Sequence, residues 1–248
     1  MATEVGDIGL ARRRAGVTIH TFTVALFVAT AVVGFAPRSA SILSGTMPVP
    51  PLAVHVHAFL MTAWIVLLAV QAGLMASGKP QQHRNLGVAS FVLAPALLAG
   101  LVGVTIVRYH DLTEAGIGAF ASNILFLQIR SIVLFPLFYV WAIAVRRTDV
   151  ETHKRLLILA TFVLLDAAVA RHTWLPGHDV MASYDPVHGY WLLLLVPALV
   201  HDVLRLGRVH RAYVIGLALI LPCVIATHFI WNSAGWHAIA AALMGVSA

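Results

Sequence analysis

The feature that most constrains this chain is a series of long apolar segments separated by short polar turns. Crossing a hydrocarbon layer of about 30 Å takes roughly 20 apolar residues in a helix. Segments of about that length recur along most of the chain. The sequence therefore predicts an all-α, polytopic transmembrane bundle of about seven helices, with spans at 17–36, 52–76, 87–108, 122–145, 156–175, 190–207 and 212–232.

Composition indicates a lipid environment for this bundle. Hydrophobic residues make up 60% of the 248 residues and charged residues only 10%, whereas a soluble domain usually carries about 25% charged residues. The lipid bilayer is therefore the expected partner. We expect an N-terminal tail at 1–16 and a single transmembrane domain at 17–248. The apolar stretch 236–243 is too short to span, and either lies at the interface or extends the last helix.

The distribution of positive charge predicts an orientation. Cytoplasmic loops of membrane proteins carry an excess of Lys and Arg, so we expect the N-terminus in the cytoplasm and the C-terminus outside. These turns also explain the net charge of +6, and no nucleic-acid partner is expected. Twelve of the sixteen Lys and Arg residues lie before the first span or in every second turn, namely Arg12, Arg13, Arg14, Lys79, Arg84, Arg146, Arg147, Lys154, Arg155, Arg205, Arg208 and Arg211.

Three of the basic turns end in a histidine followed by a base, as in His83-Arg84, His153-Lys154 and His210-Arg211. The pattern indicates either a helical hairpin used three times or the ordinary gathering of basic residues at inner helix ends. Further short motifs fall between residues 52 and 175. The whole set comprises His57, Trp64, Gln71, His83-Arg84-Asn85-Leu86-Gly87, His153-Lys154-Arg155-Leu156 and Ala168–Arg171.

In these motifs the chain resembles a group of poorly characterised bacterial multi-helix membrane proteins. The resemblance implies a multi-pass protein of the bacterial cytoplasmic (inner) membrane, and it carries no activity to this chain. A histidine beside a base, as in the three turns, is also suited to holding a lipid phosphate or a carboxylate.

Two ionisable residues are expected deep inside neighbouring spans. At 1.5 Å of rise per residue, Arg130 lies roughly 12 Å below the outer boundary and Asp166 roughly 13 Å below it. An unpaired charge at that depth is strongly unfavourable, so we expect the two side chains to form an ion pair. The pair is either purely structural or a catalytic, proton-handling site.

Histidines gather toward the same outer half and favour a metal or haem site. Neutral imidazole is a good ligand for Fe, Cu, Zn and haem iron, whereas a lone buried histidine is more often a hydrogen-bonded core residue. Two of the candidates, at 55 and 57, point to opposite sides of a regular helix, so both reach one site only if the first turn is irregular. The candidate ligands are His55, His57, His172 and His228.

A second set of residues is predicted to bind the cofactor. His57, Trp64 and Gln71 share one face of the span 52–76, which should turn toward the interior of the bundle. In the inner half, His20 and His201 are placed to hydrogen-bond across helices or to hold a second haem or metal. Trp64, Gln71 and His201 are therefore the candidate cofactor-binding residues.

Two further expectations concern side chains near the ends of helices. Asp202 and Arg205 have the i,i+3 spacing of a local ion pair on a helix. Tryptophans near the outer helix ends are typical of an interfacial belt, and walls for a ligand are the alternative. These tryptophans are Trp174, Trp191, Trp231 and Trp236.

Three functions fit these patterns. The leading hypothesis is a membrane metal- or haem-dependent oxidoreductase whose site opens to the outside. The first alternative is a proton-coupled transporter or channel, in which Asp166 and the histidines relay protons and Arg130 is the anion or counter-ion site. The second is a non-catalytic assembly subunit of a membrane complex. A small-molecule or lipophilic substrate, membrane partner subunits or a homo-oligomer are compatible partners. Motifs of the phosphate-binding loop, the serine hydrolases and the dinucleotide-binding enzymes are absent.

Overall fold

The computed structural model describes residues 18–246. The predicted tail 1–16 lies outside the described residues, so the division into a tail and one transmembrane domain stays a prediction. Each regular element in the described residues is an α-helix, which confirms the all-α class. The helices are α1 (Ile19–Leu43), α2 (Leu52–Ala76), α3 (Pro80–Gly87), α4 (Ser90–Glu114), α5 (Gly118–Val145), α6 (Val150–Phe162), α7 (Asp166–Val169), α8 (Asp185–Leu193), α9 (Val196–Leu206), α10 (Arg211–Ile230) and α11 (Ala234–Leu243).

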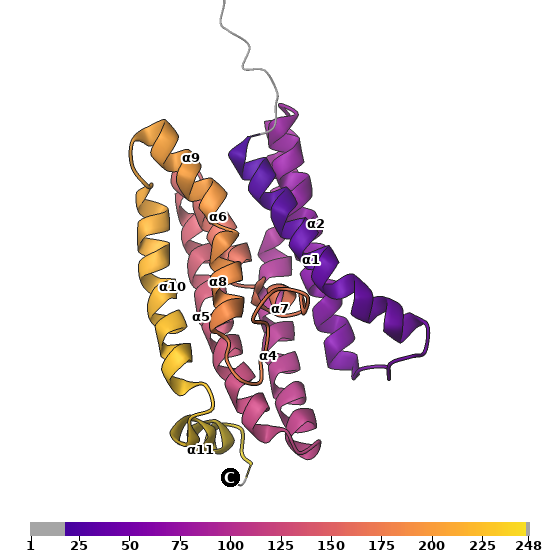
Figure 1. Ribbon diagram of the computed structural model, residues 1–248. Helices are drawn as coiled ribbons and strands as arrows, with labels where there is room; N and C mark the ends of the chain where they lie inside the picture. Colours follow the sequence, from indigo (N-terminus) through magenta and orange to yellow (C-terminus); the bar gives the residue numbers. More distant parts are fainter. Residues whose placement is uncertain (1–17, 247–248) are drawn as a thin grey trace, which may run out of the picture.

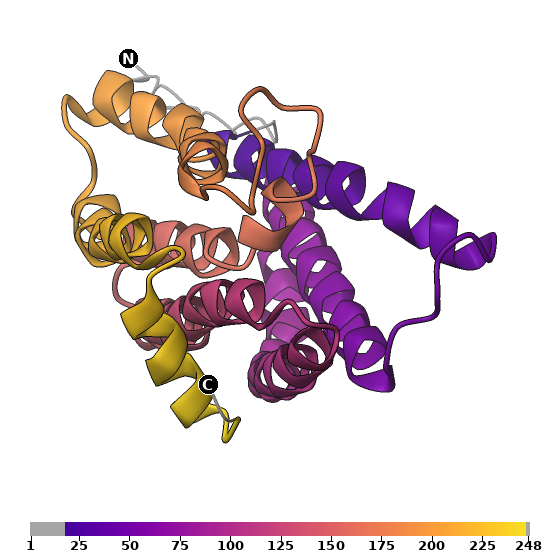
Figure 2. The same cartoon turned by 60° about the horizontal axis from the view of Figure 1, so that its bottom comes forward.

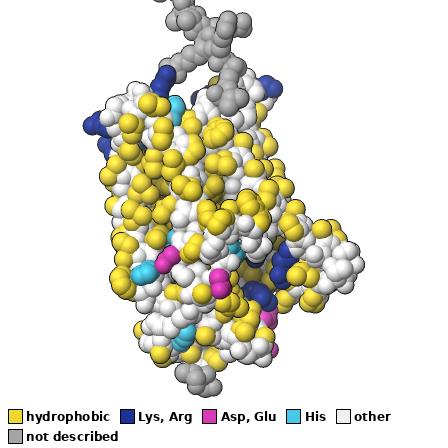
Figure 3. Space-filling model, in the orientation of Figure 1, with side chains coloured by type: hydrophobic (Ala, Val, Ile, Leu, Met, Phe, Trp, Pro, Cys, Tyr) yellow, Lys and Arg dark blue, Asp and Glu magenta, His cyan; other side chains and the backbone are white. Residues whose placement is uncertain are grey.

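Within residues 18–246, five helices are long and apolar enough to cross a membrane, namely α1, α2, α4, α5 and α10. Helices α8 and α9 together form a sixth candidate span, bent by 41° where they join. These helices make the chain a multi-pass integral membrane protein. Figure 3 shows hydrophobic side chains over most of the middle of the visible face, as contact with lipid tails requires.

Helix α5 lies in the interior of the bundle. It packs against α4 and α6, and it also contacts α10 and α11. Helices α1 and α2 lie on one side of the bundle and α10 on the other (Figures 1 and 2). Fully buried Phe27, Phe138 and Leu159 show that the apolar core runs from α1 through α5 to α6.

Local signals explain where several helices begin and end. The Thr18 hydroxyl accepts a hydrogen bond from the Thr21 N–H at 3.3 Å at the start of α1. At the start of α6, the Asp149 carboxylate accepts one from the Thr152 N–H at 2.9 Å. Such caps satisfy backbone donors that have no partner in the first turn. Gly207 ends α9 with φ of 69°, a left-handed conformation that favours glycine.

Some predicted spans are single helices and two are not. Helix α2 has the predicted bounds 52–76. The predicted span 156–175 is interrupted, because α6 has only 13 residues and the four-residue α7 follows after a break. The predicted span 190–207 is the bent pair α8–α9, where Pro197 has no N–H to continue the hydrogen bonding of α8 into α9.

The apolar stretch after the last predicted span is a separate short helix rather than an extension of α10. Helix α11 turns away from α10 at Asn232, which has a positive φ of 61°. It packs against α5 at the lower end of the bundle in Figure 1. Asn232 is fixed there by Asn123 of α5, whose side-chain amide donates to the Asn232 Oδ1 at 2.8 Å.

Candidate functional site

The break between α6 and α7 places Asp166 inside the bundle, at the first residue of α7. A break frees backbone carbonyls, each of which needs a partner in an apolar interior. The Ser131 hydroxyl of α5 donates to the carbonyl of Val163 at 2.9 Å. The Trp191 indole of α8 donates to the carbonyl of Phe162 at 2.9 Å. Side chains of two neighbouring helices therefore stabilise the break.

Arg130 of α5 and Asp166 form a buried ion pair, as the sequence predicts. The Arg130 Nη2 donates to the Asp166 Oδ2, and the two side chains are only 1% and 7% exposed. Removing either partner would leave an uncompensated charge in the apolar interior, which is strongly unfavourable. The pairing is confirmed, while the catalytic role predicted for the two residues stays a prediction.

Tyr184 and His188 extend this pair into a set of four residues that we call the buried network. The Tyr184 hydroxyl donates to the Asp166 Oδ1 at 2.9 Å. The Arg130 Nη1 lies 2.8 Å from the His188 Nε2. Because a guanidinium only donates, the His188 Nε2 is the acceptor and the imidazole proton is on Nδ1. The buried network thus joins α5, α7 and α8.

Two donors of the buried network have no hydrogen-bond partner among the described residues. They are the Nε of Arg130 and the Nδ1 of His188. Both residues are buried, at 3% and 2% exposure. Buried N–H groups in proteins nearly always have a partner, so two unused donors in one network need an explanation. A buried cation with an unused N–H is suited to an acceptor that carries negative charge.

Trp191 closes one side of the buried network. The Arg130 Cζ lies 4.6 Å from the centroid of the Trp191 ring, within the range of a cation–π interaction. Trp191 is fully buried, so its predicted place in an interfacial belt is wrong. The physical reason is that its indole N–H has a partner inside the protein, at the helix break. Trp174, which is 71% exposed, is suited to such a belt.

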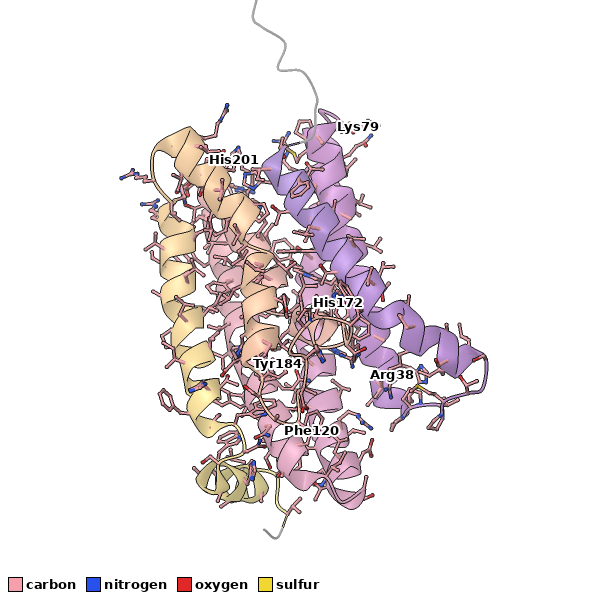
Figure 4. The ribbon with its side chains drawn as sticks, viewed as in Figure 1. Arg38, Lys79, Phe120, His172, Tyr184 and His201 are labelled. Atoms are coloured by element: carbon pink, nitrogen blue, oxygen red, sulfur yellow. The ribbon has the colours of Figure 1, made fainter. Side chains whose placement is uncertain are left out.

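Helix α7 also packs against α1. A Cβ added at Gly34 would lie 2.5 Å from the Ala168 carbonyl oxygen, so only glycine permits this approach of the two backbones. Just after α7, the His172 Nε2 donates to the Thr30 carbonyl at 3.1 Å. Figure 4 shows His172 and Tyr184 in the middle part of the bundle. The short helix that carries Asp166 is therefore fixed between α1 and the buried network.

A second buried ion pair holds the opposite end of α6. Arg155 of α6 and Asp202 of α9 are 3% and 1% exposed in their side chains. The Arg155 Nε donates to the Asp202 Oδ2 at 3.0 Å, and Nη2 donates to the other carboxylate oxygen. The predicted local pair of Asp202 with Arg205 is wrong, because Asp202 faces the bundle whereas Arg205 is exposed.

The predicted cofactor face of α2 does turn inward. Trp64 is 3% exposed, and its indole N–H donates to the Thr161 hydroxyl of α6 at 3.1 Å. His57 and Gln71 lie partly buried on the same face. The His57 Nδ1 and the Gln71 Oε1 are buried atoms without a partner in the described part of the chain. The structure thus places these residues as expected, and their binding of a cofactor stays a prediction.

The predicted metal ligands are not brought together. Among residues 18–246, no group of three or more His, Cys, Asp or Glu side chains is placed to hold a metal ion. The His228 Nδ1 lies 2.6 Å from the Asp185 Oδ2, and His172 contacts a backbone carbonyl of α1 instead. His55 is exposed, whereas His57 is half-buried, in line with their opposite directions on a regular helix.

His201 at the other end of the bundle also has no ligand set. The Nδ1 atoms of His20 and His201 are both buried and without a hydrogen-bond partner in the described residues. The hydrogen bonds of residues 18–246 include none between His20 and His201, so the predicted bond is not formed there. Figure 4 places His201 at the same end of the bundle as Lys79, far from Tyr184 and the buried network.

Sequence reasoning missed three residues of the site, namely Tyr184, His188 and Trp191. The predicted spans 156–175 and 190–207 leave Tyr184 and His188 outside the membrane, and Trp191 is expected in the interfacial belt. A signal was present, because the three residues have i, i+4 and i+7 spacing, which puts them on one face of a helix. That face points at Arg130.

No family model matches this chain, and neither a curated protein nor a solved structure matches it. The functional conclusion therefore rests on the geometry of the buried network.

Proposed function

We propose that the chain is a proton-coupled carrier of a small anion and that the buried network is its substrate site. The observation that carries this proposal is the pair of unused buried donors, the Arg130 Nε and the His188 Nδ1, beside the carboxylate of Asp166. Ionisable residues inside a membrane commonly mark ion or substrate pathways. Buried ion pairs are weak sources of stability, which supports a functional role for this one.

Protonation of Asp166 would supply the coupling. While Asp166 is ionised, it neutralises Arg130 and repels an incoming anion. A proton on the carboxylate weakens the ion pair, so the positive charge of Arg130 becomes available to a carboxylate or phosphate group. The His188 Nδ1–H, on the side of the ring away from Arg130, is a further unused donor for another polar atom of the substrate. Loss of the proton restores the ion pair and expels the anion, so one proton moves with each bound anion.

The two interrupted helices support a carrier. Discontinuous helices line the substrate sites of many transporters, because non-helical backbone in a membrane needs protein or water around it. The α6–α7 break leads directly into Asp166, and the α8–α9 bend begins six residues after His188. Since Arg130 and Asp166 are almost fully buried, substrate access requires movement. We propose the break and the bend as the hinges of that movement.

The proposal includes seven crossings, with α6–α7 as the fifth and α8–α9 as the sixth. The N-terminus lies in the cytoplasm and the C-terminus outside, in the bacterial cytoplasmic membrane. Support comes from the positive charge of the turns that hold Lys79, Arg147 and Arg208, since such turns favour the cytoplasmic side. In this orientation the buried network is nearer the outer side.

A metal- or haem-dependent oxidoreductase is the second candidate. The observation that favours it is the buried and unpartnered Nδ1 of His57, because a single histidine suffices as the protein ligand of a haem iron. Fe, Cu and Zn remain the candidate metals. The absorption spectrum and metal content of the purified protein test this candidate. The absence of both a haem band and a stoichiometric metal would contradict it.

Anion uptake into proteoliposomes tests the carrier. Labelled small carboxylates and inorganic phosphate are offered with and without an inward proton gradient. We expect the gradient to accelerate uptake of at least one anion in the wild type. Asp166→Asn should abolish this acceleration, because the side chain no longer titrates. Asp185→Asn is the matched control, since Asp185 lies outside the buried network and pairs with His228 at the surface.

Two results would overturn the carrier. One is uptake by the wild type that does not exceed that of empty liposomes for any anion of the panel. The other is uptake whose response to the proton gradient is the same in Asp166→Asn and in Asp185→Asn. Intact elution of each variant as a single species is required before its uptake is compared.

A further inference from the structure

An open groove of about 730 Å³ lies between the end of α9 and the start of α10. It is remote from the buried network, at the end of the bundle where Figure 1 shows the α9–α10 turn. Figure 3 shows Lys and Arg side chains at this upper left corner. The volume is within the roughly 300–1,000 Å³ typical of small-molecule sites.

The polar wall of this groove carries more positive than negative charge. Its two acidic residues are already paired. The Asp149 Oδ2 accepts from the Arg211 Nη2 at 2.7 Å. The Glu151 Oε2 accepts from the Arg155 Nη1 at 2.7 Å. Arg208 also lines the groove, is exposed, and has no hydrogen-bond or ion-pair partner among the described residues. The surplus charge therefore rests on Arg208.

Arg211 adds further donors to the same wall. Its side chain is 74% exposed, and its ion pair with Asp149 uses only Nη2. A guanidinium has five N–H donors in a planar fork, which matches the oxygens of a phosphate. Arg208 and Arg211 are three positions apart and flank the turn into α10, so both line one groove. Together they are suited to an anionic phosphate group.

The other wall of the groove is apolar and continues along α10. It includes Leu206 and Val209 before the helix, and Val214 and Ile215 in its first turns. Val214 and Ile215 are 53% and 42% exposed. They belong to a helix that is long and apolar enough to cross the membrane, so a chain lying on them would run in the direction of the lipid tails. A free phosphate would leave this wall unused.

We propose that the groove binds one anionic phospholipid, with its headgroup phosphate between Arg208 and Arg211 and an acyl chain along Val214 and Ile215. Charge complementarity favours an anionic lipid over a zwitterionic one, because the remaining net charge of the wall is positive. The site is independent of the proposed transport function, and its occupant holds the α5–α6 connection and the start of α10 together from outside.

Lipid binding to the full-length protein in neutral detergent tests the site. The probes are short-chain phosphatidylglycerol, phosphatidylcholine of the same chain length, and inorganic phosphate. Native mass spectrometry counts bound lipid, and thermal denaturation reports stabilisation. We expect phosphatidylglycerol to bind and to raise the denaturation temperature, and the other two probes to do neither at the same concentration.

Two variants locate the binding. Arg208→Ala should weaken phosphatidylglycerol binding about fivefold, the effect of one basic residue near a lipid surface. It should fold normally, because Arg208 has no partner to lose within residues 18–246. Arg147→Ala is the matched control, an exposed arginine at the same end of the bundle and outside the groove. Ile215→Ser should weaken lipid binding through the apolar wall.

Three outcomes would overturn the proposal. Equal weakening by Arg208→Ala and Arg147→Ala would show attraction to the whole basic surface rather than a site. Equal binding of phosphatidylcholine would show that the apolar wall acts alone. Inorganic phosphate binding as tightly as the lipid, with no effect of Ile215→Ser, would make the groove a phosphate site without a tail.

Discussion

Trp191 and Phe162 make two separate contacts. Their rings stack with centroids 4.0 Å apart and planes 13° apart, and the Trp191 indole N–H donates to the Phe162 carbonyl at 2.9 Å. One contact is between side chains and the other reaches the backbone at the last residue of α6. Helix α8 therefore fixes both the core beside the helix break and the break itself. Asp166 lies four residues further on, on the other side of this break.

Trp191→Phe should destabilise the protein although it keeps an aromatic ring in the core. The Phe162 carbonyl would keep the Leu165 N–H, at 3.0 Å, and lose the indole hydrogen bond, which contributes about 1 kcal/mol. Thermal denaturation in detergent measures the effect. Trp174→Phe is the control, because Trp174 is largely exposed. Equal denaturation temperatures for the two variants would contradict a structural role for the indole N–H.

Neutralising one member of the Arg130–Asp166 pair should harm the protein more than neutralising both. Arg130→Met alone leaves a buried, unpaired carboxylate, and the loss should be roughly 3–5 kcal/mol. The double variant Arg130→Met with Asp166→Leu removes both charges and should recover most of that loss. Expression level and denaturation temperature measure the recovery. A double variant less stable than both single variants would show that the charges do not act as a pair.

The Arg155–Asp202 pair makes a separate prediction at the other end of α6. Arg155→Gln should lower the denaturation temperature strongly, because it strands the buried Asp202. Arg205→Gln should leave it nearly unchanged, since Arg205 is exposed and is not the partner of Asp202. A larger fall in denaturation temperature for Arg205→Gln than for Arg155→Gln would instead support the local pair of Asp202 with Arg205 that the i,i+3 spacing indicates.

The start of α10 should respond to mild acid through His210. Its Nδ1 accepts the Ala212 N–H at 3.2 Å, and this cap is lost when the ring is protonated. Burial lowers the pKa of His210, and the charge of Arg155 lowers it further. The folded protein therefore takes up this proton less readily than the unfolded chain, whose histidine has a pKa of about 6.5. The stabilisation is present above that value and is lost as the pH falls through the folded pKa.

His210→Asn keeps a side chain that can cap the helix and removes the group that titrates, because asparagine also caps helices but does not titrate in this range. We expect its denaturation temperature to match that of the wild type in weakly alkaline buffer and to fall less in weakly acidic buffer. Denaturation followed by circular dichroism across this pH range checks the difference. Parallel curves for the two proteins would show that other histidines set the acid response.

Gly34→Ala should separate α1 from α7. The new Cβ would lie 2.5 Å from the Ala168 carbonyl, and backbone has to move, at about 1–3 kcal/mol for such overpacking. Gly73→Ala in α2 is the matched control, because nothing lies within 4 Å of a Cβ at Gly73. It should be neutral or slightly stabilising. An unchanged stability of Gly34→Ala would show that α1 and α7 do not pack as closely as this contact indicates.

Much of the fold could be predicted from the sequence because lipid imposes a simple rule. Length and hydropathy locate α2 and α5 with small errors, since a helix in lipid must satisfy its own backbone. The same rule failed at the α6–α7 break. There the backbone is satisfied by Ser131 and Trp191, which lie far away in the sequence, so no local pattern marks the interruption.

Only part of the site could be predicted, because some of its contacts also join residues that lie far apart in the sequence. Arg130 and Asp166 could be paired because depth along a helix follows from residue number. His188 could not, because its depth depends on how the chain folds back after α7. The histidines predicted to share a metal illustrate the limit of depth alone, since His172 and His228 each found a different partner.

The length of α6 has a consequence for how the protein is made. Thirteen residues do not cross a bilayer, so this segment has little tendency to insert by itself as it leaves the ribosome. Ser131 is synthesised before the break and is ready to cover the Val163 carbonyl. Trp191 is synthesised later, and until it arrives the Phe162 carbonyl has only the Leu165 N–H and lacks the indole hydrogen bond that joins the break to α8. Insertion of this segment should therefore be completed only when α8 emerges, which makes the middle of the chain the late step of membrane integration.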